Sequence, residues 1–316
     1  MAQTPLVITV SLNPAIDRIM EVPRFAIGQH QRGRLVSRTP AGKAVNVSRA
    51  LATLGVRNIA TGFLGEQEVE FFEKAFDPAR VQAQFLPVPA PTRENITIVD
   101  PIAHIETHIR DVGFVISDTH RIRLGKKLSL MCREGSIVVF SGSVPEGISP
   151  EQFVDLLEIC ISAGARVAVD TSGEPLRAAA SLPLWLMKPN VAELSEIAGR
   201  PLTTVADLLA AGRELARRVK TVIVSRGEAG GFCFISDSVL TGRVPLEPER
   251  VRNTVGCGDS LLAGFIAGQI LHDNVRDSYR YALAAATASA VGLEPCRFAM
   301  KDVEEFIPKA VVEGIS

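Results

Sequence analysis

The sequence predicts an α/β protein with helices on both faces of one mostly parallel central sheet. Continuous apolar runs, such as residues 136–140 and 220–224, have the pattern of parallel strands that are buried on both faces. Helical segments alternate with these runs at a length that suits right-handed β-α-β crossovers. The 316 residues, 47% of them hydrophobic, suffice for one large domain, so we expect a single domain over residues 1–316.

The elements are expected in this order along the chain. An apolar run at 6–10 predicts a first buried strand, and the glycine at position 55 closes a helix that is predicted to begin at Val47. The remaining expected elements are a strand at 59–65, an amphipathic helix at 66–76, a strand at 102–110, a helix at 119–133, a strand at 136–140, a helix at 150–163, strands at 166–170 and 220–224, and a helix at 261–271.

Composition narrows the class of partner. A formal net charge of −1 gives no reason to expect nucleic acid or a membrane surface. The apolar run near the N-terminus is too short for a signal peptide, and no stretch approaches the roughly 20 apolar residues that cross a bilayer. The five cysteines lie far apart without Cys-x-x-Cys spacing, so neither a zinc knuckle nor a disulfide framework is indicated. The expected setting is the cytoplasm.

The stretch 253–264 is the one around which the chemistry is expected. Gly256 and Gly258 permit a tight turn, and the apolar run that follows predicts a buried helix. The N–H groups at such a helix start can converge on an anion, for example a phosphoryl group in transfer. Asp259 then has two readings: it caps the helix, or it is a general base that takes a proton from a substrate hydroxyl.

The run Gly256-Cys257-Gly258-Asp259, followed by Ala263-Gly264-Phe265, resembles the C-terminal signature of ribokinase-like (PfkB-type) sugar kinases, usually Gly-Ala-Gly-Asp. The resemblance implies that Asp259 is the catalytic base and that the amides of Gly256, Cys257 and Gly258 form the anion hole. It also implies ATP and Mg²⁺, and a three-layer α/β/α fold with a small β lid built from about 13–40 and 90–115.

Several further segments resemble the phosphosugar branch of this family, typified by 1-phosphofructokinase and tagatose-6-phosphate kinase. They include Asn-Pro-x-x-Asp at 13–17, a Gly-Lys helix entry at 42–46, Thr-Arg-x-Asn at 92–95 and Ser-Gly-Ser-x-Pro at 141–145. By this resemblance the substrate-binding residues are Asn13, Asp17, Gly42, Lys43, Asn46, Arg93 and Ser141. The expected acceptor is a phosphorylated ketohexose, with fructose 1-phosphate favoured and tagatose 6-phosphate next.

The nucleotide side is expected to involve Lys188, an Asn-x-x-Glu motif at Asn190 and Glu193, and the Ser225 and Gly227 loop. The resemblance implies that Asn190 and Glu193 hold Mg²⁺ through water, and that Ser225, Gly227, Gly256 and Gly258 approach the ATP phosphates. Asn followed three residues later by Glu is also the pattern of a capping box, and the sequence leaves both interpretations open.

The chain departs from the family pattern around the acceptor. Ala41 and Ala44 replace glycines, Thr97 replaces a lysine, and Thr107-His108-Ile109-Arg110 stands where Thr-Glu-x-Asn is usual. These departures keep a second hypothesis open, in which the acceptor is an unphosphorylated sugar or a nucleoside. Arg110 is expected to restore the cation that is missing at Thr97.

Other features of the sequence have more than one interpretation. His104, Glu106, His108 and Arg110 are predicted on one strand face, which either binds a metal or, as we favour, is a solvated or substrate-facing part of the lid. Cys257 either fills space or has an eased ionisation at the helix N-terminus, where oxidation would block the anion hole. A non-catalytic nucleotide or sugar regulator is the alternative of another class. A homodimer joined through the lid is the expected assembly.

Overall fold

The computed structural model describes residues 4–236 and 238–315. Within this part of the chain, ten strands form one sheet in the order β14-β13-β12-β11-β10-β9-β8-β1-β4-β5. The pairs from β11 to β5 are parallel, and β12, β13 and β14 extend one edge as antiparallel strands. The strands of this sheet are β1 (Val7–Ser11), β4 (Asn58–Gly65), β5 (Val81–Val88), β8 (Ile137–Ser141), β9 (Arg166–Asp170), β10 (Leu186–Met187), β11 (Thr221–Ser225), β12 (Gly231–Ile235), β13 (Ser238–Arg243) and β14 (Val311–Ile315).

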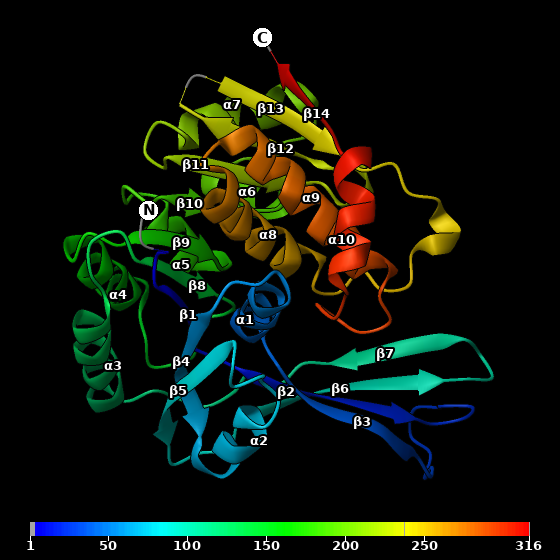
Figure 1. The fold of residues 1–316 in the computed structure, drawn as a ribbon. Helices are drawn as coiled ribbons and strands as arrows, with labels where there is room; N and C mark the ends of the chain where they lie inside the picture. The colour runs from blue at the N-terminus through cyan, green and yellow to red at the C-terminus, as the bar shows by residue number, and fades with distance from the viewer. Residues whose placement is uncertain (1–3, 237, 316) are drawn as a thin grey trace.

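Helices cover both faces of this sheet, which confirms the predicted three-layer α/β/α class (Figure 1). Alternate residues of each buried strand enter opposite cores: in β8, Val138 packs toward α3–α7, whereas Val139 packs toward α1, α8, α9 and α10. The helices are α1 (Lys43–Thr53), α2 (Val69–Glu73), α3 (Asp118–Met131), α4 (Pro150–Ser162), α5 (Gly173–Ala179), α6 (Val191–Ala198), α7 (Val205–Leu215), α8 (Cys257–His272), α9 (Val275–Val291) and α10 (Met300–Phe306).

A separate four-stranded sheet extends away from the layered body (Figure 1). Its order is β3-β2-β6-β7, with β2 (Ala15–Glu21), β3 (Arg34–Ala41), β6 (Arg93–Asp100) and β7 (Ile105–Ile109). The two halves come from the segments that the sequence indicated for a lid, and they join where β2 runs parallel to β6. We call this the small sheet.

A single carboxylate ties together the outer end of the small sheet. Asp100 is almost fully buried and accepts hydrogen bonds from the backbone N–H groups of Arg24, Phe25, Ile102 and Ala103, at 2.9–3.2 Å. Burial alone would raise the pKa of Asp100, but these hydrogen bonds hold it below its ordinary value. The loop after β2 and the turn after β6 therefore share one anchor.

Several expected boundaries were wrong. α1 begins at Lys43, four residues before the predicted start, because Gly42 is its N-cap. The predicted helix at 66–76 consists of a 3₁₀ turn, Glu66–Glu68, followed by the short α2. The strand predicted at 102–110 is β7 alone, since His104 has a φ of 55° and lies in the preceding turn. Among the described residues, none of the helices has the length and apolarity needed to cross a membrane.

Candidate active site

The start of α8 is shaped by two glycines. Gly256 is the N-cap with a φ of 80°, and a Cβ there would meet Cys296 Sγ at 2.8 Å. A Cβ at Gly258 would meet Lys188 Nζ at 3.3 Å. Both positions therefore favour glycine, the first for backbone conformation and the second because an ammonium group lies over the helix start. The N–H groups of this first turn lie beside a cation.

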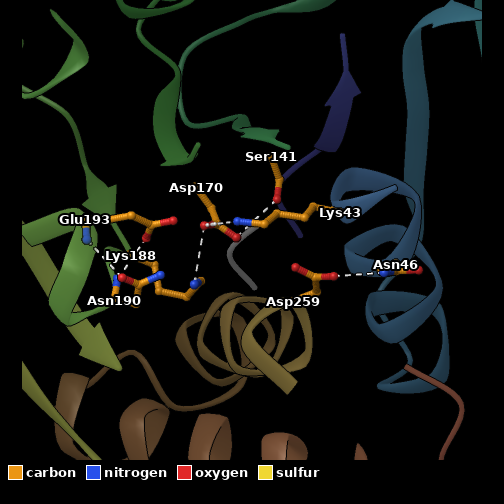
Figure 2. A network of polar contacts seen from close by, with 8 residues as sticks. All are labelled: Lys43, Asn46, Ser141, Asp170, Lys188, Asn190, Glu193 and Asp259. Atoms are coloured by element: carbon orange, nitrogen blue, oxygen red, sulfur yellow. Dashed lines mark hydrogen bonds and ion pairs between the residues drawn. The ribbon is translucent and has the colours of Figure 1, made fainter. Parts of the chain in front are cut away.

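Asp259 lies in the first turn of α8 and is buried, with 5% of its surface exposed. Gly256 is the N-cap and has no side chain, so the reading of Asp259 as the cap residue was wrong. Instead Asn46 Nδ2 of α1 donates a hydrogen bond of 2.8 Å to Asp259 Oδ2 (Figure 2). Burial, and then the nearby charge of Asp170, raise the pKa of Asp259 to about 7 against the opposing effect of Asn46. A carboxylate with this pKa is suited to proton abstraction near neutral pH.

Asp170 is the centre of the polar cluster and was missed by the sequence analysis. It is fully buried at the carboxyl end of β9, and its Oδ1 lies 3.1 Å from Lys43 Nζ and 3.3 Å from Lys188 Nζ. Ser141 Oγ donates to its Oδ2 at 3.3 Å (Figure 2). Although burial opposes ionisation, the two lysines hold the pKa of Asp170 below its ordinary value. The available signal was its position, since polar residues that end parallel strands gather at one edge of the sheet.

The local backbone explains how Lys43 and Asn46 reach this cluster. Gly42 has a φ of 110°, and a Cβ there would lie 3.2 Å from Pro14 Cα. The glycine thus lets the chain turn closely against the loop after β1 and begin α1 at Lys43. Asn46 then lies about one turn further along the helix, facing Asp259.

On the other side, Asn190 and Glu193 begin α6 as a capping box. The Asn190 N–H donates to Glu193 Oε2 at 2.8 Å, and the Glu193 N–H donates to Asn190 Oδ1 at 2.9 Å. The capping interpretation is therefore realised in the structure. Glu193 is nevertheless 92% buried, and its charge is among those that raise the pKa of Lys43 after Asp170 and Asp259. Its carboxylate thus acts on the central cluster as well as on its own helix.

Ser225 ends β11 and forms a backbone bridge with Asn190. Gly227 follows with a φ of 59°, and a Cβ there would meet no atom within 4 Å. The structure therefore brings Ser225 beside the Asn190 and Glu193 pair and leaves open space over Gly227.

The remaining residues that the resemblance implied for the acceptor lie where the small sheet meets the layered body. Asn13 is buried and donates from Nδ2 to Val112 O at 3.0 Å and to Ser143 Oγ at 3.2 Å. Asp17, on β2, accepts a hydrogen bond of 2.8 Å from Asn95 Nδ2 of β6. Arg93 donates to three backbone carbonyls around them. These residues form a second polar group beside the Asp170 and Asp259 cluster.

The chain matches the pfkB family carbohydrate kinases over residues 6–295. It belongs to that family. The chain is 34% identical to the 1-phosphofructokinase of Haemophilus influenzae over 263 residues, 83% of each chain, and 31% identical to that of Bacillus subtilis over 309 residues, 98% of each chain. The solved phosphofructokinase-2 from Escherichia coli, in complex with potassium, superimposes with a TM-score of 0.90 at 25% identity, covering 97% of this chain and 99% of that chain.

As a pfkB kinase, the protein is a phosphotransferase that acts on a hydroxyl group, and family membership implies ATP as the donor. The alternative of another class, a non-catalytic regulator, is therefore not supported. The motifs that resembled this family in the sequence thus belong to a match that extends over most of the chain.

The cysteine hypothesis does not survive in this pfkB kinase. Burial raises the pKa of the Cys257 thiol to about 11, so the prediction that the helix N-terminus eases its ionisation was wrong. The neighbouring Cys296 contacts the start of α8 directly: its Sγ lies 3.1 Å from Gly256 O and accepts a hydrogen bond of 3.3 Å from Ser260 Oγ. Cys257 is better described as a small, half-buried side chain that fills space.

The strand face on which a metal was one of two interpretations differs from the prediction. His104 lies in a turn rather than on β7, which leaves Glu106 and His108, with Glu106 Oε2 and His108 Nε2 3.6 Å apart. In residues 4–236 and 238–315, no group of three or more His, Cys, Asp or Glu side chains has the arrangement of a metal site. The favoured interpretation, an exposed polar strand face of the small sheet, agrees with this geometry.

Proposed function

We propose that this kinase transfers the γ-phosphoryl group of ATP to a hydroxyl of a phosphorylated ketohexose, with fructose 1-phosphate as the acceptor and tagatose 6-phosphate as the next choice. The observation that carries the proposal is the buried Asp259 carboxylate at the start of α8, in contact with the acceptor-side Asn46. Relatives named 1-phosphofructokinase, 31–34% identical over most of the chain, support the choice of substrate.

The residues of the cluster have distinct tasks in the proposed reaction. Asp259 accepts the proton of the attacking hydroxyl, and Asn46 orients the carboxylate through its hydrogen bond. The first N–H groups of α8 and the Lys188 ammonium over Gly258 stabilise negative charge on the phosphoryl group in transfer. Asp170 holds Lys43 and Lys188 together, so that both cations border the path between donor and acceptor.

The donor set suits a magnesium nucleotide. Mg²⁺ keeps several waters and binds through one or two carboxylates together with substrate phosphates. Glu193 offers a buried carboxylate whose Oε2 alone serves the capping box, and Asp170 offers a second carboxylate nearby. We propose that Glu193, with Asn190 beside it, would hold the ion, which would offset phosphate charge. Ser225 and Gly227 would border the ATP phosphates.

The test is an ADP-release assay with MgATP against fructose 1-phosphate, fructose 6-phosphate, tagatose 6-phosphate, fructose, ribose and adenosine. Strong turnover of fructose 1-phosphate supports the proposal, with a kcat/KM at least about 100-fold above that for fructose. Turnover of fructose, ribose or adenosine alone would refute it and favour a neutral acceptor, for which the replaced glycines at Ala41 and Ala44 are the sequence signal.

We further propose that the chain acts as one catalytic unit whose small sheet is a lid, and that two copies join through it. Leu35, Ile105 and Ile109 are each 49–53% exposed, and the strand register puts them on one face of the small sheet, an apolar surface that a second copy of the chain would cover. A dimer in sedimentation experiments that dissociates in an Ile105→Asp, Ile109→Asp variant supports this assembly, and a monomeric wild-type enzyme contradicts it. All five cysteines are free, which suits the reducing cytoplasm that we propose as the setting.

A further inference from the structure

The small sheet has two faces with different neighbours. One face carries the hydrogen-bonded pair of Asp17, which the resemblance implied for the acceptor, and Asn95. Because successive strand residues alternate, Arg18 and Glu94, which adjoin that pair in the sequence, lie on the opposite face. We call this opposite face the back of the small sheet. The cross-strand partner of Arg18 on β3 is Arg38, which therefore lies on the back as well.

On the back of the small sheet, Glu94 is bound by two arginines. Its Oε2 accepts a hydrogen bond of 2.8 Å from Arg18 Nη1 of β2, and its Oε1 accepts one of 3.1 Å from Arg38 Nε of β3. Burial alone would raise the pKa of Glu94, but these two hydrogen bonds hold it below its ordinary value. Since Glu94 itself belongs to β6, one carboxylate ties β2, β3 and β6 together directly behind the Asp17 and Asn95 pair.

Arg38 also reaches out of the small sheet to the layered body. Its guanidinium carbon lies 4.7 Å from the centroid of the Phe71 ring in α2, which is the geometry of a cation–π contact (Figure 1). The Phe71 ring meets the ring of Phe72 edge to face, with 6.2 Å between their centroids. Phe72 is fully buried in the hydrophobic cluster that α2 forms with α1, β4 and β5. Arg38 thus connects a ring that is fixed in the body to Glu94 of the small sheet.

A second contact joins the same part of the body to the start of β6. Glu68, in the 3₁₀ turn before α2, accepts a hydrogen bond of 3.0 Å at Oε2 from the N–H of Thr92. Thr92 Oγ1 in turn accepts a hydrogen bond of 3.0 Å from the N–H of Gly65. Thr92 immediately precedes β6, so the body segment that contains α2 holds the small sheet at two points, the start of β6 and the Arg38 side chain.

We propose that Arg38 is a positioning residue for the acceptor, because its bridge between Phe71 and Glu94 fixes the angle of the small sheet on the layered body. The strands transmit this restraint to the Asp17 and Asn95 pair on the other face. When the bridge is broken, the small sheet takes up other angles, and the apparent affinity for the acceptor falls with the fraction of molecules in the competent arrangement. The inference rests on the proposed function, since it assumes that the acceptor binds to the face that carries Asp17.

The experiment measures binding and turnover of fructose 1-phosphate, binding of MgATP, and hydrogen exchange of the small sheet, for the wild-type enzyme and for Arg38→Gln. The variant is expected to raise Kd and KM for fructose 1-phosphate about 3- to 10-fold, with kcat within about twofold. The amides of β2 and β6 should exchange faster. The Kd of MgATP should not change, because the residues proposed for the nucleotide belong to the layered body.

Further variants separate the bridge from a general effect of charge. Because Arg38 and Phe71 act in one bridge, Phe71→Leu should raise Kd to a similar extent, and the double variant should bind as tightly as either single variant. Arg38→Lys should recover part of the affinity, since lysine keeps the charge but loses the planar fork that pairs with Glu94. Arg34→Gln is the matched control: Arg34 lies on the same strand and pairs with Glu21 at 3.2 Å, and its replacement should leave every constant unchanged.

An unchanged Kd or unchanged hydrogen exchange in Arg38→Gln would overturn the inference while leaving the proposed function intact. Additive losses in the double variant would also overturn it, as would an equal loss in Arg34→Gln. A loss that accompanies dissociation of the proposed dimer in sedimentation would assign the effect to assembly and contradict the bridge. A wild-type enzyme that neither binds nor turns over a phosphosugar would instead remove the proposed function, which the wild-type assay alone reveals.

Discussion

The cluster around Asp170 and Asp259 and the small sheet solve the problem of charge in opposite ways. In the cluster the carboxylates are buried, and each is compensated by a partner from a different element. In the small sheet the ion pairs are partly exposed and link neighbouring strands. Under the proposed function, the chemistry takes place where charges are desolvated and fixed, whereas the acceptor is selected where a charge can be exchanged at low cost in stability.

The largest effect is expected at the cluster. Asp259→Asn removes the proposed base and should lower kcat by about 10³-fold without loss of folding. The pKa of Asp259 is raised to about 7 from an unfolded value of about 3.9, so its favourable contribution to stability is present below pH 4 and lost as pH rises through about 7. The melting temperature of the variant at pH 8 should therefore equal or exceed that of the wild type.

Asp273→Asn is the matched control, since Asp273 ends the same helix in the left-handed region, which asparagine tolerates. It should keep wild-type turnover. For the wild-type enzyme, kcat should rise with pH through about 7 and then level, because the base must be ionised. A pH-independent kcat between pH 5 and 9, or normal turnover in Asp259→Asn, would refute the assignment.

The second effect tests whether the charges of the cluster act together. Asp170→Asn leaves Lys43 and Lys188 beside an uncharged amide, and breaking such a buried arrangement costs on the order of 3 kcal/mol. We expect a lower denaturant midpoint and a 10- to 100-fold lower kcat. Since Asp170 is a cause of the raised pKa of Asp259, the acid limb of the pH–rate profile should also move to lower pH. A profile that does not move would mean that the two carboxylates are not coupled.

How much of this could be read from the sequence differs between the two regions. The turn and helix at 256–271 were predicted because glycines and a continuous apolar run are local signals. Asp170 was missed because its partners, Lys43 and Lys188, are brought to it only by the parallel order of β1, β8, β9 and β10. The backbone contacts of Arg93 were also hidden, since they depend on two loops that no local pattern positions together.

In the small sheet the expected effect is moderate and concerns binding. Asp100→Asn weakens an anchor that holds four backbone N–H groups, so the outer end should loosen, with KM for the acceptor raised several-fold and kcat nearly unchanged. Hydrogen exchange at Arg24, Phe25, Ile102 and Ala103 measures the loosening directly. Because the pKa of Asp100 is lowered, the wild-type anchor persists above the ordinary aspartate range and is lost as pH falls through the folded pKa. A large fall in kcat would contradict the division between the two regions.

The smallest effect is expected from Cys257→Ala. The thiol is half-buried with its pKa raised to about 11, so it is not ionised at neutral pH, and alanine fills most of the same space. We expect kcat and KM within about twofold of the wild type and no difference in loss of activity after mild peroxide treatment. Protection of activity in the variant would restore the redox hypothesis.

The parallel pairing of β2 with β6 has a consequence for the order of folding. Partners such as Asp17 and Asn95 are 78 residues apart, and β4, β5 and α2 lie between them in the chain. Joining them directly would carry a large loop-closure entropy, but the β1–β4–β5 unit brings both ends together once it has formed. We therefore expect the small sheet to be assembled after the rate-limiting step, so that substitutions in it speed unfolding and leave the folding rate almost unchanged.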